Sequence, residues 1–149
     1  MRFYPAAEMT RIEFRTDIAD KISYTCRWVR KALSLSPTPK IVLFVRDRAQ
    51  LTRLDEALWT FSDPDFLPHV MAGDPNVARS PVVLTDSDTV ELPHHQILVN
   101  LSDTIPSYFA QFERLLEIVS TDQADTEAGR QRYAHYRQRG YTLHHEATR

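Results

Sequence analysis

The chain has 149 residues and a formal net charge of −2, and its hydrophobic and charged fractions, 42% and 26%, are typical of globular proteins. That length fits one domain with one hydrophobic core, and we expect a single α/β domain over residues 1–149. Proteins that grip nucleic acid by its phosphates usually carry a basic excess, so the charge argues against direct duplex binding. The three glycines are scattered and form no G-x-x-x-x-G-K or G-x-G-x-x-G loop, which argues against a nucleotide-binding site.

The single cysteine, Cys26, cannot form an internal disulfide, which is compatible with a reducing compartment. No apolar run approaches the ~20 residues of a membrane span. The first residues lack the apolar stretch of a signal peptide. We therefore expect a cytoplasmic protein.

The first third of the chain alternates helix and strand signals. Phe3 and Tyr4 could open a short strand, and apolar residues at helical spacing predict a first helix over Thr16–Leu35. The apolar run Lys40–Val45 predicts a strand covered on both faces, as in a parallel sheet. Asp47, with Gln50 three residues later, predicts the capped start of a second helix. The buried stripe of this second helix is expected at Leu51, Leu54, Leu58 and Phe61.

The middle of the chain begins with an irregular loop over Ser62–Ser80, which is rich in proline. Two further short strands are expected at Pro81–Thr85 and Gln96–Leu101. Pro106 is expected near the start of a third helix, where its missing N–H costs nothing. The broad apolar face of that helix would comprise Tyr108, Phe109, Phe112, Leu115, Leu116 and Val119.

A last helix is expected to begin at a capping box formed by Ser120 and Gln123 and to run to about Arg139. Gly140 is placed to end it in the left-handed conformation. Strands that alternate with helices predict a three-layer α/β/α single domain with a largely parallel central sheet.

Few residues carry a catalytic or metal-binding signal. The tandem pairs His94–His95 and His144–His145 are poorly spaced to chelate one metal and are expected in solvated loop and tail segments. Asp86 and Asp88 follow a predicted strand and could hold a metal or act as acid and base, but a turn-forming role is commoner. Cys26 falls on an apolar stripe, where it should be buried and inert. We expect no catalysis, no cofactor and no metal.

Two aromatic residues stand outside the expected core. Trp59 lies roughly 120° from the centre of the apolar stripe of its helix. It either packs under a neighbouring loop or marks a partner surface. Phe66, a large apolar residue in a polar loop, raises the same question. We expect both side chains to be substantially exposed within one surface patch.

The last predicted helix is both basic and aromatic. Arg130, Tyr133 and Arg137 share one face, which suits a carboxylate or phosphate beside an apolar ring. Arg132, Tyr136 and Arg139 make an adjacent face. By composition alone, a solvated amphipathic helix with tyrosine rings packed at its edge is the favoured explanation of this pattern.

Three segments, in this order along the chain, resemble the chi subunit of bacterial DNA polymerase III. The first is Arg53-Leu54-Asp55-Glu56-Ala57-Leu58-Trp59, and the second is Phe66-Leu67-Pro68-His69 followed by Ala72-Gly73. The third is the run from Arg130 to Arg137 with Gly140, Tyr141 and Leu143. The correspondence holds from Lys40 onward, except around Val77–His94.

The resemblance implies a replication adaptor without catalytic activity or cofactor. Members of this family bind the psi subunit, which ties them to the clamp loader, through one surface. Through another they bind the acidic C-terminal tail of single-stranded DNA-binding protein, which ends in a phenylalanine with a free carboxylate. Their contact with DNA is therefore indirect.

The resemblance also assigns site residues. Trp59 and Phe66 match aromatics of the psi-binding surface, and Arg130 matches the arginine that holds the terminal carboxylate of the tail. The pocket for the last ring of the tail would involve Val119, Tyr133, Gly140 and Leu143. Thr126 and Ala134 stand where lysines would meet the acidic residues of the tail, so this site is expected to be less basic.

Two other functions compete with the adaptor reading. One is a small α/β enzyme that uses Asp86, Asp88 or the histidine pairs, which would require a closed pocket. The other is a direct single-strand binder that uses the tyrosines and arginines of the last helix, with an affinity that falls steeply with salt.

Overall fold

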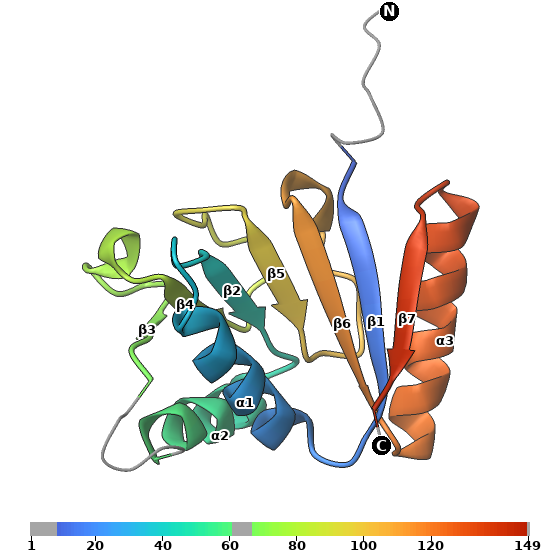
Figure 1. Cartoon of the computed structure of the whole chain (residues 1–149), viewed down its shortest axis with the longest axis horizontal. Helices are drawn as coiled ribbons and strands as arrows, with labels where there is room; N and C mark the ends of the chain where they lie inside the picture. The colour runs from blue at the N-terminus through green and yellow to red at the C-terminus, as the bar shows by residue number, and fades with distance from the viewer. Residues whose placement is uncertain (1–8, 61–66, 149) are drawn as a thin grey trace, which may run out of the picture.

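The protein is described by a computed structural model over residues 9–60 and 67–148 (Figure 1). Its strands form one sheet in the order β3-β4-β2-β5-β6-β1-β7, and every neighbouring pair is parallel. The strands are β1 (Arg11–Ile18), β2 (Ile41–Phe44), β3 (Val70–Met71), β4 (Val82–Thr85), β5 (Ile97–Asn100), β6 (Arg114–Ser120) and β7 (Leu143–Ala147). The α-helices are α1 (Lys21–Leu33), α2 (Arg48–Thr60) and α3 (Gln123–Gln138). The predicted three-layer fold with a parallel sheet is confirmed.

The sheet is covered on both faces, as the apolar run in β2 predicts. Ile41 and Leu43 pack into one core cluster with apolar residues of α1 and α2. Val42 and Phe44 point to the opposite face, where Tyr136 of α3 belongs to the second cluster. Figure 1 shows α1 and α2 on one side of the sheet and α3 on the other. None of the described helices is long and apolar enough to cross a membrane.

Aspartates cap the three α-helices. The Asp20 carboxylate accepts hydrogen bonds from the backbone N–H groups of Ile22 and Ser23. Asp47 accepts from the N–H of Gln50, as expected, at 2.8 Å. The last helix is capped by Asp122, which accepts from the N–H of Asp125, so the expected cap at Ser120 is wrong.

The helix predicted over Thr16–Leu35 begins too early. Residues 11–18 form β1, which lies between β6 and β7 in the sheet. Asp17 has a φ of 60°, in the left-handed region, and interrupts the ladder between β1 and β6. Ile18 is buried, but from a strand and not from a helix. The short strand proposed at Phe3 and Tyr4 lies outside the described residues.

The third predicted helix does not form. Pro106 precedes a single 3-10 turn over Phe109–Gln111, and Arg114–Ser120 is strand β6. Its apolar residues are buried on both faces: Leu116 and Ile118 belong to the core cluster with α1 and α2, and Leu115 and Val119 belong to the cluster under α3. Two-sided burial erases the alternation that marks a strand, so this apolar run could be mistaken for a helix face.

The chain ends in a strand that the sequence did not reveal. Gly140 ends α3 with a φ of 89°, as predicted, and β7 then pairs with β1 at the edge of the sheet. His144 and His145 are exposed as expected, but they lie on this strand and not in a loose tail. The predicted irregular loop also contains the two-residue strand β3.

Candidate functional site

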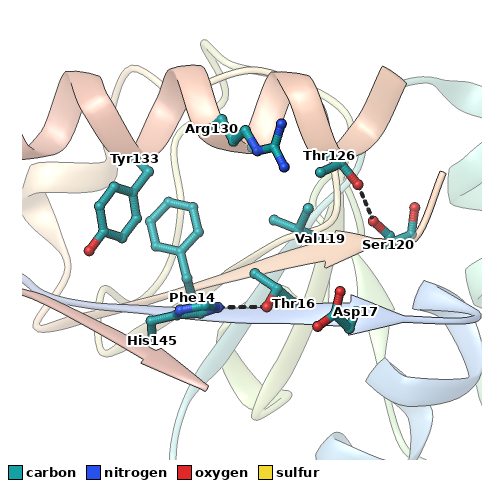
Figure 2. Close-up of a pocket in the computed structure, with 10 residues that line it drawn as sticks. Phe14, Thr16, Asp17, Val119, Ser120, Thr126, Arg130, Tyr133 and His145 are labelled. Atoms are coloured by element: carbon teal, nitrogen blue, oxygen red, sulfur yellow. Dashed lines mark hydrogen bonds between the residues drawn. The ribbon is translucent and has the colours of Figure 1, made fainter. Parts of the chain in front are cut away.

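A pocket of about 350 Å³ lies between α3 and the face of the sheet formed by β6, β1 and β7. Its lining comprises Phe14, Thr16, Asp17, Val119, Ser120, Thr126, Gly129, Arg130, Tyr133 and His145 (Figure 2). Four separate elements therefore contribute to one cavity. It contains Arg130, Tyr133 and Val119, three of the five residues expected at the tail site.

One end of the pocket is apolar. The buried ring of Phe14 forms its floor, and the ring of Tyr133 meets it edge-on with centroids 5.1 Å apart. The side chain of Val119 lies beside them on β6 and is also buried. An aromatic ring from a ligand could pack here, because edge-on contacts of this kind are favourable between aromatic rings.

The other end is polar and carries a cation without a counter-ion. Arg130 leaves α3 on the side that faces the sheet (Figure 2), and its side chain is exposed. It forms no ion pair or hydrogen bond with any residue in the described part of the chain. Thr126 also lines this end, but its hydroxyl donates to the Ser120 carbonyl at 2.9 Å. Arg130 is thus available to an anionic ligand.

The close approach of α3 to the sheet depends on a glycine. A Cβ added at Gly129 would lie 2.9 Å from both methyl carbons of Val119. Only a residue without a side chain fits there without displacing its neighbour. A glycine inside a helical pattern often marks a close contact, so the sequence did contain a signal that could have pointed to Gly129. Phe14, Thr16 and His145 gave no such signal.

The other two expected pocket residues lie elsewhere. Leu143 opens β7 opposite Ile12 and packs, half-buried, against the cluster under α3. Gly140 is exposed in the turn between α3 and β7. Neither lines the cavity, so their contribution is to the path of the chain into β7, which carries His145 to the pocket.

A buried charged network fixes α3 on the sheet. Glu117 of β6 has no exposed surface, and Arg132 donates to its carboxylate through Nε at 3.1 Å. Tyr136 O–H donates at 2.6 Å and the Asn100 amide at 3.0 Å. Burial raises the pKa of Glu117, and these three donors oppose that shift. The face of α3 with Arg132 and Tyr136 is therefore a structural anchor, and Arg130 belongs to the accessible face.

The second expected site is only partly described. Trp59 is 49% exposed at the end of α2, as predicted, whereas Phe66 and Phe61 lie outside the described residues. The Trp59 indole packs on the imidazole of His69 with centroids 4.9 Å apart. His69 is held between the Leu67 carbonyl and the Asp55 carboxylate. A shallow groove of about 290 Å³ runs from Trp59 over Pro68, Val70 and Pro81.

Two of the candidates for catalysis, Asp86 and Asp88, have structural partners. Asp86 pairs with Arg48 at 3.7 Å, and Asp88 accepts from the backbone N–H of Ser107. His94, expected to be solvated, is half-buried, and burial lowers its pKa. Cys26 is buried as predicted, and burial raises the pKa of its thiol to about 11. No group of three or more His, Cys, Asp or Glu side chains able to hold a metal occurs in residues 9–60 and 67–148.

The Thr16 hydroxyl and the His145 imidazole are in hydrogen-bonding contact, with Oγ1 and Nε2 2.6 Å apart, and such a contact can also occur between a catalytic nucleophile and its base. A nucleophile and base of this kind need a third group that orients the imidazole and donors for an oxyanion. Within the described chain His145 has no second hydrogen bond. The pair is therefore better suited to binding than to acyl transfer.

Comparison with known proteins identifies the family. The family described as DNA polymerase III chi subunit, HolC, matches residues 9–144. The DNA polymerase III subunit chi of Pseudomonas aeruginosa is 32% identical over 141 residues, which cover 91% of this chain and 94% of the relative. The proteins of the same name from Haemophilus influenzae and Escherichia coli are each 27% identical over 104 residues, or 70% of this chain. These segments cover 72% and 71% of the two relatives. The chain belongs to the DNA polymerase III chi subunit family.

Proposed function

We propose that the chain is a non-catalytic accessory subunit of DNA polymerase III that joins the replication machinery to coated single-stranded template. In this role it binds the psi subunit of the clamp loader through one surface. It binds the acidic C-terminal tail of single-stranded DNA-binding protein through another. Family membership supports the coarse function, and the pocket under α3 supports the tail-binding role.

The observation that carries the tail-binding role is an arginine that has no ion pair within residues 9–60 and 67–148 and lies beside an aromatic floor. A guanidinium can bind a terminal carboxylate with two parallel hydrogen bonds, which a lysine cannot copy. Arg130 offers that group, while Phe14 and Tyr133 offer a surface for the ring of a terminal phenylalanine. The two chemical features of such a peptide end thus correspond to the two ends of one cavity.

The test is a titration with an acidic peptide that ends in phenylalanine with a free carboxylate. Losing a charge-assisted hydrogen bond typically costs on the order of 1.5–3 kcal/mol, so Arg130→Ala should reduce affinity about tenfold or more. Arg130→Lys should recover only part of the loss. Amidation of the peptide should mimic Arg130→Ala, and combining the two changes should add little.

Arg137 provides the matched control. It is an exposed arginine on the same helix and does not line the cavity, so Arg137→Ala should have a much smaller effect. Binding should weaken as salt rises, because the peptide is acidic and the site is open to solvent. Equal affinity of wild type and Arg130→Ala in the same low-salt titration would refute the role of Arg130.

The psi-binding role rests on Trp59. Interface aromatics commonly act as anchors, so Trp59→Ala should weaken psi binding by roughly 2 kcal/mol or more. Because Trp59 is half exposed, the thermal midpoint should change little. Leu35 is another exposed large apolar residue and serves as the control. Leu35→Ala should leave the affinity for psi unchanged. A variant that melts far lower but binds psi normally when folded would make Trp59 a core residue.

The same samples test the competing functions. A direct single-strand binder would bind oligonucleotide without any partner protein, with an affinity that falls steeply with salt. If the chain were an enzyme that used Asp86 or Asp88, these carboxylates would have to break their present contacts with Arg48 and with the backbone N–H of Ser107. Binding of the tail peptide without measurable oligonucleotide binding would favour the adaptor.

A further inference from the structure

We infer that His145 is a second, protonation-dependent cationic contact of the pocket, so that binding of an acidic peptide is coupled to the uptake of a proton. This inference rests on the proposed tail-binding function of the same pocket. His145 lies on β7 opposite Phe14, and its exposed side chain joins Arg130 in the lining.

The contact between His145 and Thr16 supports a change of protonation state. The Nε2 and Oγ1 atoms are 2.6 Å apart (Figure 2), and a hydroxyl can donate to or accept from an imidazole. In the imidazolium both ring nitrogens carry hydrogen, so the hydroxyl must accept. Where the neutral ring accepts from the Thr16 hydroxyl, that hydrogen is then released from the ring and can be donated to an anion in the pocket. Protonation therefore adds a positive charge and, from that tautomer, also frees one donor.

The charges that face His145 come from two elements. From β1 Asp17 lines the pocket, and its carboxylate favours the imidazolium. From α3 Arg130 and Tyr133 line it, and the guanidinium opposes a second positive charge. The lining residues of β6 carry no charge. On β7 the neighbouring Glu146 is paired with Arg15 of β1 at 3.3 Å.

Peptide binding removes the main obstacle to protonation. A carboxylate that pairs with Arg130 neutralises the guanidinium and adds negative charge near His145. Coupling of this kind is reciprocal, so a peptide that promotes protonation must itself bind more tightly as the pH falls. Histidine is suited to this role because its charge changes between about pH 8 and pH 5. The imidazolium also supplies positive charge that Thr126 and Ala134 do not.

The experiment is the same peptide titration at about pH 8.0, 6.5 and 5.5, with ionic strength held constant. The aspartate and glutamate side chains of the peptide stay largely ionised over this range because their ordinary pKa values are about 4. Exposed ion pairs contribute modestly, so wild-type affinity should rise about two- to fivefold as pH falls. His145→Gln should remove this rise and bind at every pH with about the affinity of wild type at pH 8.0.

His144 supplies the matched control. It is the adjacent histidine of β7, lies opposite Glu13 in the register of β1 and β7, and does not line the pocket. His144→Gln should keep the pH response, and so should Arg130→Lys, although with weaker binding. Calorimetry in buffers of different ionisation enthalpy should show net proton uptake by wild type near pH 6.5, but not by His145→Gln.

The outcomes separate this inference from the proposed function. Tight binding that does not change with pH would overturn the role of His145 alone. The same holds if His145→Gln keeps the full pH response, or if His144→Gln loses it. Absence of peptide binding at all three pH values would overturn the tail-binding function and this inference together.

Discussion

The contact between Gly129 and Val119 makes a one-methyl test of the pocket possible. Alanine is favoured over glycine in a helix interior by about 1 kcal/mol, so Gly129→Ala would stabilise α3 if space were available. The new Cβ would instead lie 2.9 Å from two methyl carbons, where ordinary carbon contacts are about 3.5–4.0 Å. Overpacking of this kind typically costs about 1–3 kcal/mol. We therefore expect a net loss of about 1 kcal/mol in the free energy of unfolding.

The same substitution should alter the pocket without changing any charge. Val119 must yield or α3 must move outward, because the added methyl group would lie too close to both methyl carbons of Val119. Both movements displace lining residues of the cavity, so tail-peptide affinity should fall in Gly129→Ala. Arg130 remains present, which distinguishes this loss from the loss of its guanidinium.

A double-mutant cycle with Val119→Ala isolates the steric contact. Val119→Ala alone removes buried methyl groups and should destabilise the fold, whereas the methyl of Ala at position 129 would partly fill that space in the double variant. We expect a favourable coupling of about 1–2 kcal/mol between the two changes, measured by urea unfolding. Gly73→Ala is the matched control, since a Cβ there meets nothing within 4 Å.

The result that would refute this reasoning is a Gly129→Ala protein that gains the full helix-propensity stabilisation. Free-energy changes of Gly129→Ala and Val119→Ala that simply add in the double variant would refute it equally. In either case α3 would not approach β6 as closely as the structure describes, and the shape assigned to the pocket would be wrong.

Two further predictions concern buried charges. Burial alone would raise the pKa of Glu13, but hydrogen bonds and charge from Arg114 and Arg15 lower it from 4.5 to about 2. The lowered pKa makes Glu13 stabilise the fold above about pH 4.5, and this contribution, about 1–2 kcal/mol after screening of the part-exposed arginines, should disappear as pH falls toward 2. Urea unfolding from pH 7 to 2.5 should show a smaller acid loss in Glu13→Gln than in wild type. Arg132→Met leaves the Glu117 carboxylate buried without its cation and should cost about 3–5 kcal/mol, much of which Glu117→Gln should restore. Equal melting of wild type and Arg132→Met would contradict that account of the network.

The sequence alone determined the features that depend on neighbouring residues. The cap at Asp47 and the left-handed end of α3 at Gly140 follow from contacts within a few residues, and strand β2 follows from an uninterrupted apolar run; all are confirmed. The exposure of Trp59 was expected from its angle on α2 together with the family resemblance. The family resemblance also singled out Arg130 before the pocket was known.

Tertiary structure decided the features that depend on distant partners. The hydrogen bonds of β1 go to β6 and β7, more than 100 residues away along the chain, so β1 was not predicted and its last three residues were assigned to the following helix. β6 was missed because both of its faces are buried. β7 was missed because a parallel edge strand is defined by its neighbour and not by its own pattern.

The pocket also depends on contacts between residues that are far apart in the sequence. Arg130 and Tyr133 could be assigned to one face of a helix from their spacing, because one helix places both side chains. Phe14 and His145 reach the same cavity only because β1 and β7 pair beside each other under α3. Residues brought together by a sheet ladder carry no mutual spacing in the sequence, and so the sequence singled out Arg130 but not His145 among the residues that line the pocket.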